Sequence, residues 1–227
     1  MRTAERTPPR LFADVAALGA AMLAVGASFG AVAVAAGVPG WAAVLMSLAV
    51  YAGGAQFMAV GLISVGSPLA AVFAGLLLNA RHLPFGMTLG ATLGPRLAHR
   101  LVGAHLLTDE ATAYTLSQPD DAGRRRIFWS MSVGLFVAWN VGTVAGVLLG
   151  GVAGDPAALG LDAAFPAGLI AMLLPSLRDP DTRRVAIAGA VLAVALTPVL
   201  PAGLPVLCAL AGLILLALRR SRPVQPC

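Results

Sequence analysis

Lysine is absent from this 227-residue sequence, and charged residues of every kind are scarce. Only 11% of the residues are charged, against about 25% in an ordinary soluble domain. A soluble protein of this length needs polar side chains to cover its surface, and this chain does not contain enough of them. With 59% hydrophobic residues and a mean hydropathy of +0.87, the composition excludes an ordinary soluble enzyme or binding module.

Cysteine and histidine are also rare, which narrows the chemistry further. The two cysteines, Cys208 and Cys227, cannot form a disulfide framework of the kind that holds small secreted domains together. The three histidines, His82, His99 and His105, do not have the spacing of a zinc motif. We therefore predict no metal site and no cofactor. No basic surface with interleaved aromatic residues indicates a nucleic-acid partner.

What the sequence does contain is a series of apolar runs, several of them long enough for a membrane helix, which needs about 20 residues. The runs are continuous and rich in Ala and Leu rather than alternating, which favours helices over strands. We predict an all-α, polytopic helical membrane protein: a basic cytoplasmic tail (1–10), a single transmembrane domain (11–218) and a second cytoplasmic tail (219–227). The expected spans are residues 11–38, 41–63, 69–91, 97–117, 127–152, 159–177, 185–200 and 204–218.

The arginines set the expected topology, because cytoplasmic flanks of membrane helices carry an excess of positive charge. They gather in four clusters, at residues 2–10, 124–126, 178–184 and 219–222. All four lie on the cytoplasmic side if the weakly apolar segment 97–117 crosses the membrane, which gives eight spans and two cytoplasmic termini. The alternative is seven spans, with that segment on the surface and the N-terminus outside. A weak similarity between residues 29–37 and 141–151 suggests two parallel halves.

The stretch "LLLNARHLPFG" (76–86) places polar groups near the middle of the third expected span. Asn79, Arg81 and His82 are the groups in question, and Pro84 leaves the carbonyl of Ala80 without its helical donor. Asn and His often hydrogen-bond neighbouring membrane helices, so interhelical packing is one reading of them. For Arg81 we favour an ion pair or a functional role, because an unpaired guanidinium is costly at this depth.

The stretch "LLTDEATAYTL" (106–116) predicts a helix start in the middle of the fourth expected span. Thr108 has the character of an N-cap, with Asp109 and Glu110 in the first helical turn. Acidic residues at a helix start are often only a capping pattern. At mid-depth in a membrane they are also the natural partners for Arg81 or His82, and candidates for carrying a proton.

Two more interruptions fall in apolar runs. In "YAGGAQFMAVG" (51–61), Gly53 and Gly54 weaken the helix beside the Tyr51 hydroxyl and the Gln56 amide, although small residues also serve close helix packing. In "LGLDAAFPAG" (159–168), Asp162 precedes a proline and is either interfacial or buried; we count it with Arg81, His82, Asp109 and Glu110 as a candidate for the charge network or proton coupling.

A further pattern belongs to the first expected span. "GASFG" (26–30) matches a serine-hydrolase pattern around Ser28, but close packing of small residues explains it better. We also expect that span to be tilted or broken near these glycines.

Taken together, "YAGGAQF", "LLLNARH", "LTDEATA" and "LGLDAAFPAG" resemble the AzlC family, the large subunit of two-component branched-chain amino acid exporters. The third motif of that family usually reads Asn-Leu-Arg, where this chain has Ala80, and the first span lacks the usual Pro before its Gly pair. The resemblance implies proton-driven efflux of valine, leucine or isoleucine across a bacterial inner membrane. It also implies a small, four-helix partner subunit of the AzlD type.

These observations lead to one hypothesis, a secondary transporter without enzymatic activity, whose site lies at mid-membrane. Asn79, Arg81, Asp109 and Glu110 form the expected polar core, and Asp109 or Glu110 couples transport to protons because carboxyl groups in a low dielectric can retain a proton. Tyr51, Gln56 and the Gly53–Gly54 backbone bind the polar end of the amino acid. Phe57 and Met58 receive its side chain. The alternatives are a membrane scaffold subunit that does not transport, or an intramembrane hydrolase at Ser28.

Overall fold

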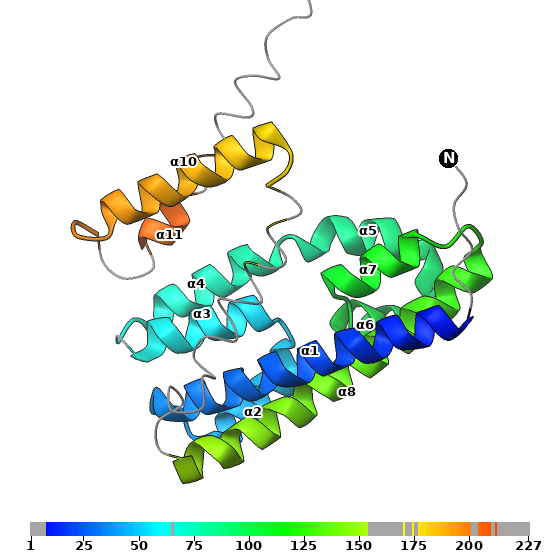
Figure 1. Cartoon of the computed structure of the whole chain (residues 1–227), viewed down its shortest axis with the longest axis horizontal. Coiled ribbons are helices and arrows are strands. Elements are labelled where there is room, and N and C mark those ends of the chain that lie inside the picture. Colours follow the sequence, from blue (N-terminus) through cyan, green and yellow to red (C-terminus); the bar gives the residue numbers. More distant parts are fainter. Residues whose placement is uncertain are drawn as a thin grey trace, which may run out of the picture.

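The computed structural model describes residues 8–64, 66–153, 177–200 and 204–209, together with Ile170, Leu174 and Gly212. Within these residues all regular secondary structure is helical, which confirms the predicted class (Figure 1). Asp162 and the arginines of residues 219–222 lie outside the described residues. The helices are α1 (Pro8–Ala35), α2 (Gly40–Val50), α3 (Gly53–Ser64), α4 (Pro68–Asn79), α5 (His82–Leu93), α6 (Leu97–His105), α7 (Asp109–Leu116), α8 (Asp121–Ala153), α10 (Pro180–Leu196) and α11 (Leu204–Cys208).

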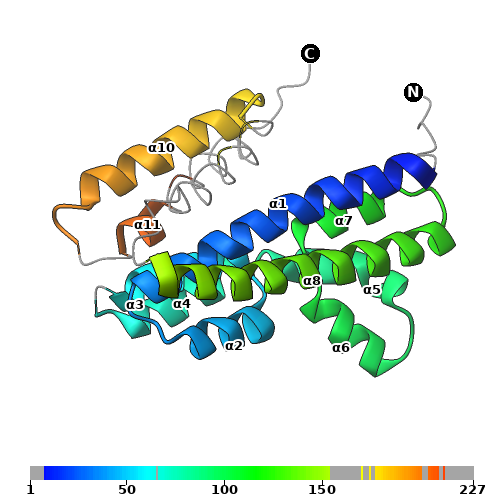
Figure 2. The same cartoon turned by 60° about the horizontal axis from the view of Figure 1, so that its bottom comes forward.

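The two longest helices, α1 and α8, lie side by side and run in the same direction (Figures 1 and 2). Their contacts advance together along both chains: Gly134 faces Val15, Gly142 faces Leu23, and Gly150 faces Ala31. At Gly142 the backbone of Leu23 comes so close that there is no room for a side chain, and at Gly150 the backbone of Ala31 leaves little room, whereas Gly134 makes an ordinary side-chain contact with Val15. This is the close packing that small residues allow between membrane helices.

The same packing corrects one prediction and confirms another. Helix α1 continues without interruption through "GASFG", so the break expected at residues 26–30 is wrong. Gly26 and Gly30 instead rest on the backbone of Trp139 and Thr143 in α8. The glycines therefore serve close helix contact, as the small-residue reading of this motif predicted, and α1 stays continuous against its tightly packed neighbour.

The bundle has two ends, and two contacts define them. At one end Arg125, in the first turns of α8, donates from Nε to the carbonyl of Thr92 at the end of α5 (3.2 Å). At the other end Gly40, the first residue of α2, lies against the side chain of Val147. We call the first the basic end, because it carries Arg124–Arg126, and the second the opposite end.

Helices α2 and α3 form a hairpin that enters the bundle from the opposite end (Figure 1). Along α2, Ser47 hydrogen-bonds Thr143 (3.0 Å), and the ring of Tyr51 then reaches Phe136, nearer the basic end. Helix α3 leads back again and packs against α4, with Leu62 contacting Ala71. The expected crossing of residues 41–63 is therefore wrong, because this segment returns to the end from which it entered.

Helices α6 and α7 form a second hairpin, which enters from the basic end. The ring of His99 contacts Trp129, and that of His105 reaches Phe136, so α6 runs inward. Helix α7 leads back, because Leu116 is joined to Asp121 at the start of α8 by only the short linker 117–120. The expected crossing of residues 97–117 is also wrong, since Gly94 before it and Arg125 after it lie together.

The length of these half-helices explains why the hairpins do not cross. Helix α6 has 9 residues and α7 has 8, so each rises only about 12–14 Å, less than half of a hydrocarbon core of about 30 Å. Because two expected crossings both turn back, the remaining crossings still bring Arg124–Arg126 to the same end as the N-terminus of α1. The arginine clusters therefore predicted correctly that Arg124–Arg126 and the N-terminus of α1 lie at the same end, although two of the crossings expected between them do not occur.

Helices α4 and α5 are bent by 45° at their junction and together run from the opposite end to the basic end. With α1 and α8, this pair makes three elements of the described chain that are long and apolar enough to cross a bilayer. Helix α10, capped by Asp179, packs against α11 through Gly189 and Ala209. The expected count of eight spans is not confirmed, because two of its segments turn back within the bundle.

Candidate functional site

Three helix breaks meet in the middle of the bundle, at Tyr51–Ala52, Ala80–Arg81 and Leu106–Thr108. Two contacts connect them. The ring Nε2 of His105, at the end of α6, lies 2.9 Å from the carbonyl oxygen of Leu48 in α2. The guanidinium of Arg81, between α4 and α5, lies 3.1 Å from the carboxylate of Asp109 at the start of α7. The expected interruptions in these three segments are confirmed.

At the first break the chain reverses through Tyr51, whose backbone is left-handed (φ 43°, ψ 51°). Gly53 follows, and a Cβ there would lie 2.9 Å from the indole ring of Trp139, so a side chain would push the ring away. The side-chain oxygen of Gln56 accepts a hydrogen bond from the backbone N–H of Ala52 (3.1 Å). The break therefore falls at Tyr51–Ala52, just before the Gly53–Gly54 pair that was expected to weaken the helix, and Gln56 holds the resulting turn.

Two polar groups beside this turn are buried and have no hydrogen-bond partner within the part of the chain that the structure describes: the hydroxyl of Tyr51 and the side-chain NH₂ of Gln56. Tyr51 is 4% exposed and Gln56 is fully buried. Leaving such a group unpaired costs about 1–3 kcal/mol. Both lie at the start of α3, where the first N–H groups of a helix and its dipole favour an anion. Each of the two side chains can donate a hydrogen bond to a ligand carboxylate.

The second and third breaks supply the charges. Thr108 caps α7, its hydroxyl accepting from the N–H of Ala111 (3.2 Å), which confirms the expected cap. One oxygen of Asp109 faces Arg81, while the other, Oδ1, is buried without a partner. The expected pairing of Arg81 with an acid of this helix is thus found. The free oxygen leaves Asp109 able to accept one more donor, such as an ammonium group or a proton.

The prediction for Pro84 needs a correction. The carbonyl of Ala80 is not left open, because it accepts from the N–H of Leu83 (3.1 Å). The helix breaks before His82, so Pro84 falls in the first turn of α5, where a missing N–H is tolerated. The ring Nδ1 of His82 lies 3.1 Å from the carbonyl of Asn79, which ties this histidine to the turn rather than to an acid.

Glu110 lies in the first turn of α7, within electrostatic range of the Tyr51 hydroxyl. The side chain of Asn79 is half-buried at the end of α4. The two apolar residues expected to line one pocket lie apart. Phe57 contacts Phe29 in the core between α1 and α8, while Met58 packs between α3 and α4.

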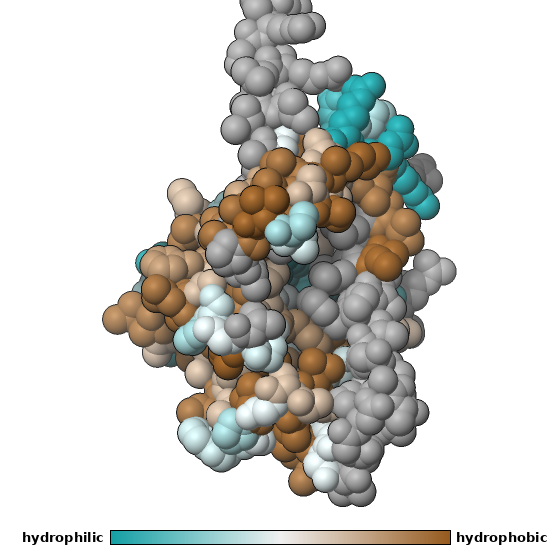
Figure 3. Space-filling model, turned by 90° about the vertical axis from the view of Figure 1, so that its left-hand side faces the viewer, coloured by the Kyte–Doolittle hydropathy of each residue, from teal (hydrophilic) through white to brown (hydrophobic). Residues whose placement is uncertain are grey.

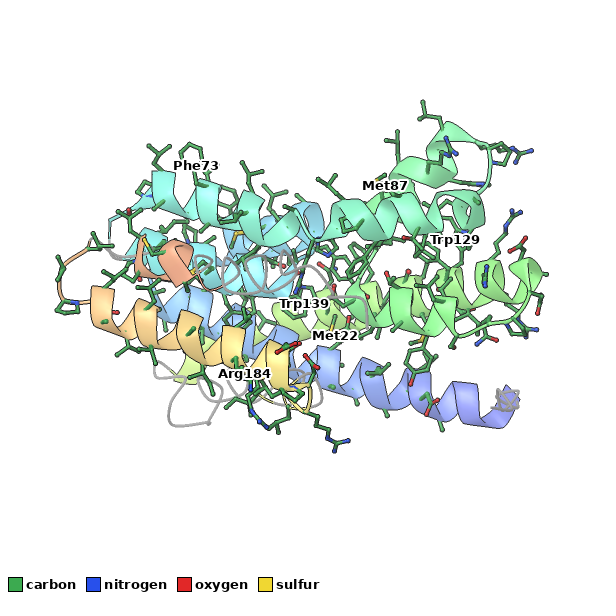
Figure 4. The ribbon with its side chains drawn as sticks, turned by 90° about the horizontal axis from the view of Figure 1, so that it is seen from above. Met22, Phe73, Met87, Trp129, Trp139 and Arg184 are labelled. Atoms are coloured by element: carbon green, nitrogen blue, oxygen red, sulfur yellow. The ribbon has the colours of Figure 1, made fainter. Side chains whose placement is uncertain are left out.

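Two polar groups of α8, on Trp139 and Asn140, were not among the expected site residues. The indole N–H of Trp139 is buried without a partner, as is the side-chain oxygen of Asn140. Asn140 donates its NH₂ to the carbonyl of Phe136 in its own helix (2.9 Å) rather than bonding a neighbouring helix. Trp139 stacks on Phe29 and lies in the interior of the bundle (Figure 4). The signal available in the sequence was the pair "WN" in the middle of an apolar run.

The outer surface of α4 and α5 carries large exposed apolar side chains. Phe73 on α4 and Met87 on α5 point away from the bundle and are 59% and 84% exposed (Figure 4). Apolar residues dominate the described surface in a view onto the opposite end (Figure 3). Large exposed apolar side chains on these helices suit contact with hydrocarbon rather than water.

Comparison with known proteins agrees with these features. Residues 17–153 match the model of the AzlC protein family. An uncharacterized membrane protein of Archaeoglobus fulgidus is 31% identical over 151 residues, a region that covers 66% of each chain. No solved structure gave a match. The family match covers more than half of the sequence and includes all three helix breaks, so this chain belongs to the AzlC family of membrane proteins.

Proposed function

We propose that this protein is a secondary transporter that exports branched-chain or related amino acids, with its substrate site at the three helix breaks. The observation that carries the proposal is the pair of buried, unpartnered polar groups at the start of α3, on Tyr51 and Gln56. Broken helices with open ends at mid-depth are how many transporters hold a substrate carboxylate. A structural packing role alone gives no reason for these groups to stay unpaired.

The two sides of the site match the two charges of an amino acid. The carboxylate binds at the start of α3, to the Gln56 NH₂ and the Tyr51 hydroxyl. The ammonium group binds the free oxygen of Asp109 or the carboxylate of Glu110 at the start of α7. Arg81 holds Asp109 in place through its other oxygen. The apolar side chain of the substrate packs against Phe57.

The hairpins supply a means of alternating access. One enters from each end of the bundle, and their tips touch where His105 meets the carbonyl of Leu48. Withdrawal of one tip at a time opens the site to one side of the membrane. Protonation of Asp109 or Glu110 couples this cycle to the proton gradient, and a small AzlD-type subunit in the same bacterial inner membrane completes the exporter.

Counterflow in proteoliposomes tests the proposal. Vesicles loaded with unlabelled valine should accumulate labelled valine when they contain this chain and the small subunit. Asp109→Asn and Glu110→Gln should each change the pH dependence of that uptake. If neither the chain alone nor the pair moves any amino acid of a full panel, the transport proposal is wrong. Normal transport by both variants at every pH would rule out the proton coupling and the ammonium site at the start of α7, but not transport itself.

A further inference from the structure

We propose that the basic end carries a binding site for the headgroup of an anionic phospholipid, formed by Arg100 on α6 and Arg125 on α8. These two residues, the arginine pair, come from different helices but are held on the same turn. Arg100 donates from Nε to the carbonyl of Gly94 (3.2 Å), and Arg125 donates from Nε to the carbonyl of Thr92 (3.2 Å). The site is separate from the helix breaks and does not depend on the transport proposal.

The way the arginines are anchored leaves the right atoms available. Among the described residues each uses only its Nε–H, on a backbone carbonyl at the end of α5 or just after it, so the terminal nitrogens of both guanidinium groups are available for a second partner. Gly94 brings the two groups together: its φ of +85° forms the turn, and Nη2 of Arg125 lies 3.7 Å from where a Cβ on Gly94 would be. Planar guanidinium forks match phosphate oxygens in a bidentate manner.

The two nearby acids, Asp120 and Asp121, do not neutralise the arginine pair. Asp121, in the first turn of α8, forms its ion pair with Arg124 (3.6 Å). The other acid of this region, Asp120, accepts from the backbone N–H of Gly123 (2.7 Å). Two fixed positive charges without a carboxylate partner in the described contacts favour an anion from outside the chain.

The surroundings select a lipid rather than a soluble anion. Helix α6 carries exposed apolar side chains directly beside the arginines, with Leu97 70% and Leu101 62% exposed. Trp129 lies at the same end, in contact with the ring of His99 (6.0 Å), and tryptophan is enriched at the level of lipid headgroups. An anionic phospholipid can place its phosphate on the arginine pair and its acyl chain on the leucines, whereas free phosphate can bind only the arginine pair. Basic pockets on the cytoplasmic side of membrane proteins bind such headgroups.

Lipid binding is tested on the full-length protein in detergent, with Trp41→Phe as background to remove an exposed tryptophan. The protein is titrated with phosphatidylglycerol whose acyl chains are brominated, and quenching of tryptophan fluorescence reports binding. Arg100→Gln together with Arg125→Gln should weaken the apparent affinity about 25-fold, or about fivefold for each guanidinium. The matched control, Arg183→Gln with Arg184→Gln on α10, should leave it unchanged. Equal affinities in the two double variants would overturn the proposal.

Two further arms separate the alternatives. Arg100→Lys with Arg125→Lys keeps the charge but loses the anchored fork, so its affinity should fall between wild type and the Gln variant. Wild-type affinity in the Lys variant would overturn the assigned geometry, and this variant decides the matter if the Gln variant does not fold. Millimolar inorganic phosphate should not displace the brominated lipid. Displacement would show a site for soluble anions instead. Loss of thermal stability without any loss of lipid affinity would show that the arginines only cap α5.

Discussion

The seam between α1 and α8 gives the sharpest stability prediction, because two glycines of one helix differ only in their surroundings. A Cβ added at Gly146 would collide with the backbone of Ala27, which cannot move without separating the two helices. A Cβ added at Gly151 meets nothing within 4 Å. The same substitution, Gly→Ala, should therefore have opposite effects at two positions about 1.4 turns apart on one helix.

The size of the difference follows from two opposing terms. Alanine favours a helix over glycine by up to about 1 kcal/mol, and Gly151→Ala should gain part of that. At Gly146 the same gain is outweighed by overpacking, which costs about 1–3 kcal/mol where backbone must shift. At about 2–4 °C per kcal/mol for a chain of this size, Gly146→Ala should lower the Tm by up to about 8 °C.

Thermal unfolding in detergent, followed by tryptophan fluorescence, measures this effect. Trp139 is a suitable reporter, since its carbonyl lies at the same seam against Gly26. The two variants should be purified and compared under one condition, with gel filtration to show that both are monodisperse. Equal Tm values for Gly146→Ala and Gly151→Ala would refute the parallel close packing of α1 and α8.

Three other predictions follow from the described contacts. In a double-mutant cycle, Arg81→Gln and Asp109→Asn should show a favourable coupling of about 1 kcal/mol or more in unfolding free energy, because the pair is partly buried; a coupling near zero would mean that the two charges do not interact. In a background without native cysteines, single cysteines introduced at Pro95 and at Asp120 should be labelled by an impermeant reagent from the same side of the membrane. Labelling from opposite sides would show that residues 97–117 cross the membrane. The side chain and backbone of Thr182 donate to the Asp179 carboxylate and lower its pKa, so this cap stabilises α10 fully above about pH 4 and loses its effect as pH falls through the lowered pKa. In Asp179→Ala the protection of the α10 amides against exchange should no longer depend on pH in this range. An unchanged profile of protection against pH would contradict the cap.

Local chemistry was readable from the sequence because each break has a local cause. Gly53–Gly54 removes helix propensity, and Thr108 offers a cap, so both interruptions were placed correctly. The partner of Arg81 also followed from charge, since an arginine at mid-depth requires an acid and Asp109 and Glu110 were the nearest candidates.

Direction of the chain after each break was not readable, because hydropathy is the same for a helix that crosses and for two half-helices that turn back. Segment 97–117 has the length of a span, yet the Gly94 turn and Arg125 lie at one end. The break expected at residues 26–30 failed for a related reason. Glycine weakens an isolated helix, but here the backbone of α8 packs against these glycines and keeps α1 continuous. Both misses concern tertiary contacts, which local sequence does not encode.

The central claim is that the buried polar groups at the start of α3 bind the substrate, and equilibrium binding of labelled leucine tests it most directly. Gln56→Leu keeps the size of the side chain and removes the unpartnered NH₂, while Gln118→Leu makes the same change at a half-buried position in the linker between α7 and α8. We expect the purified protein with its small subunit to bind leucine. Gln56→Leu should weaken leucine binding at least about tenfold, a loss of about 1.4 kcal/mol of binding free energy, whereas Gln118→Leu should leave the leucine affinity unchanged. Unchanged leucine affinity in a well-folded Gln56→Leu protein would contradict the central claim.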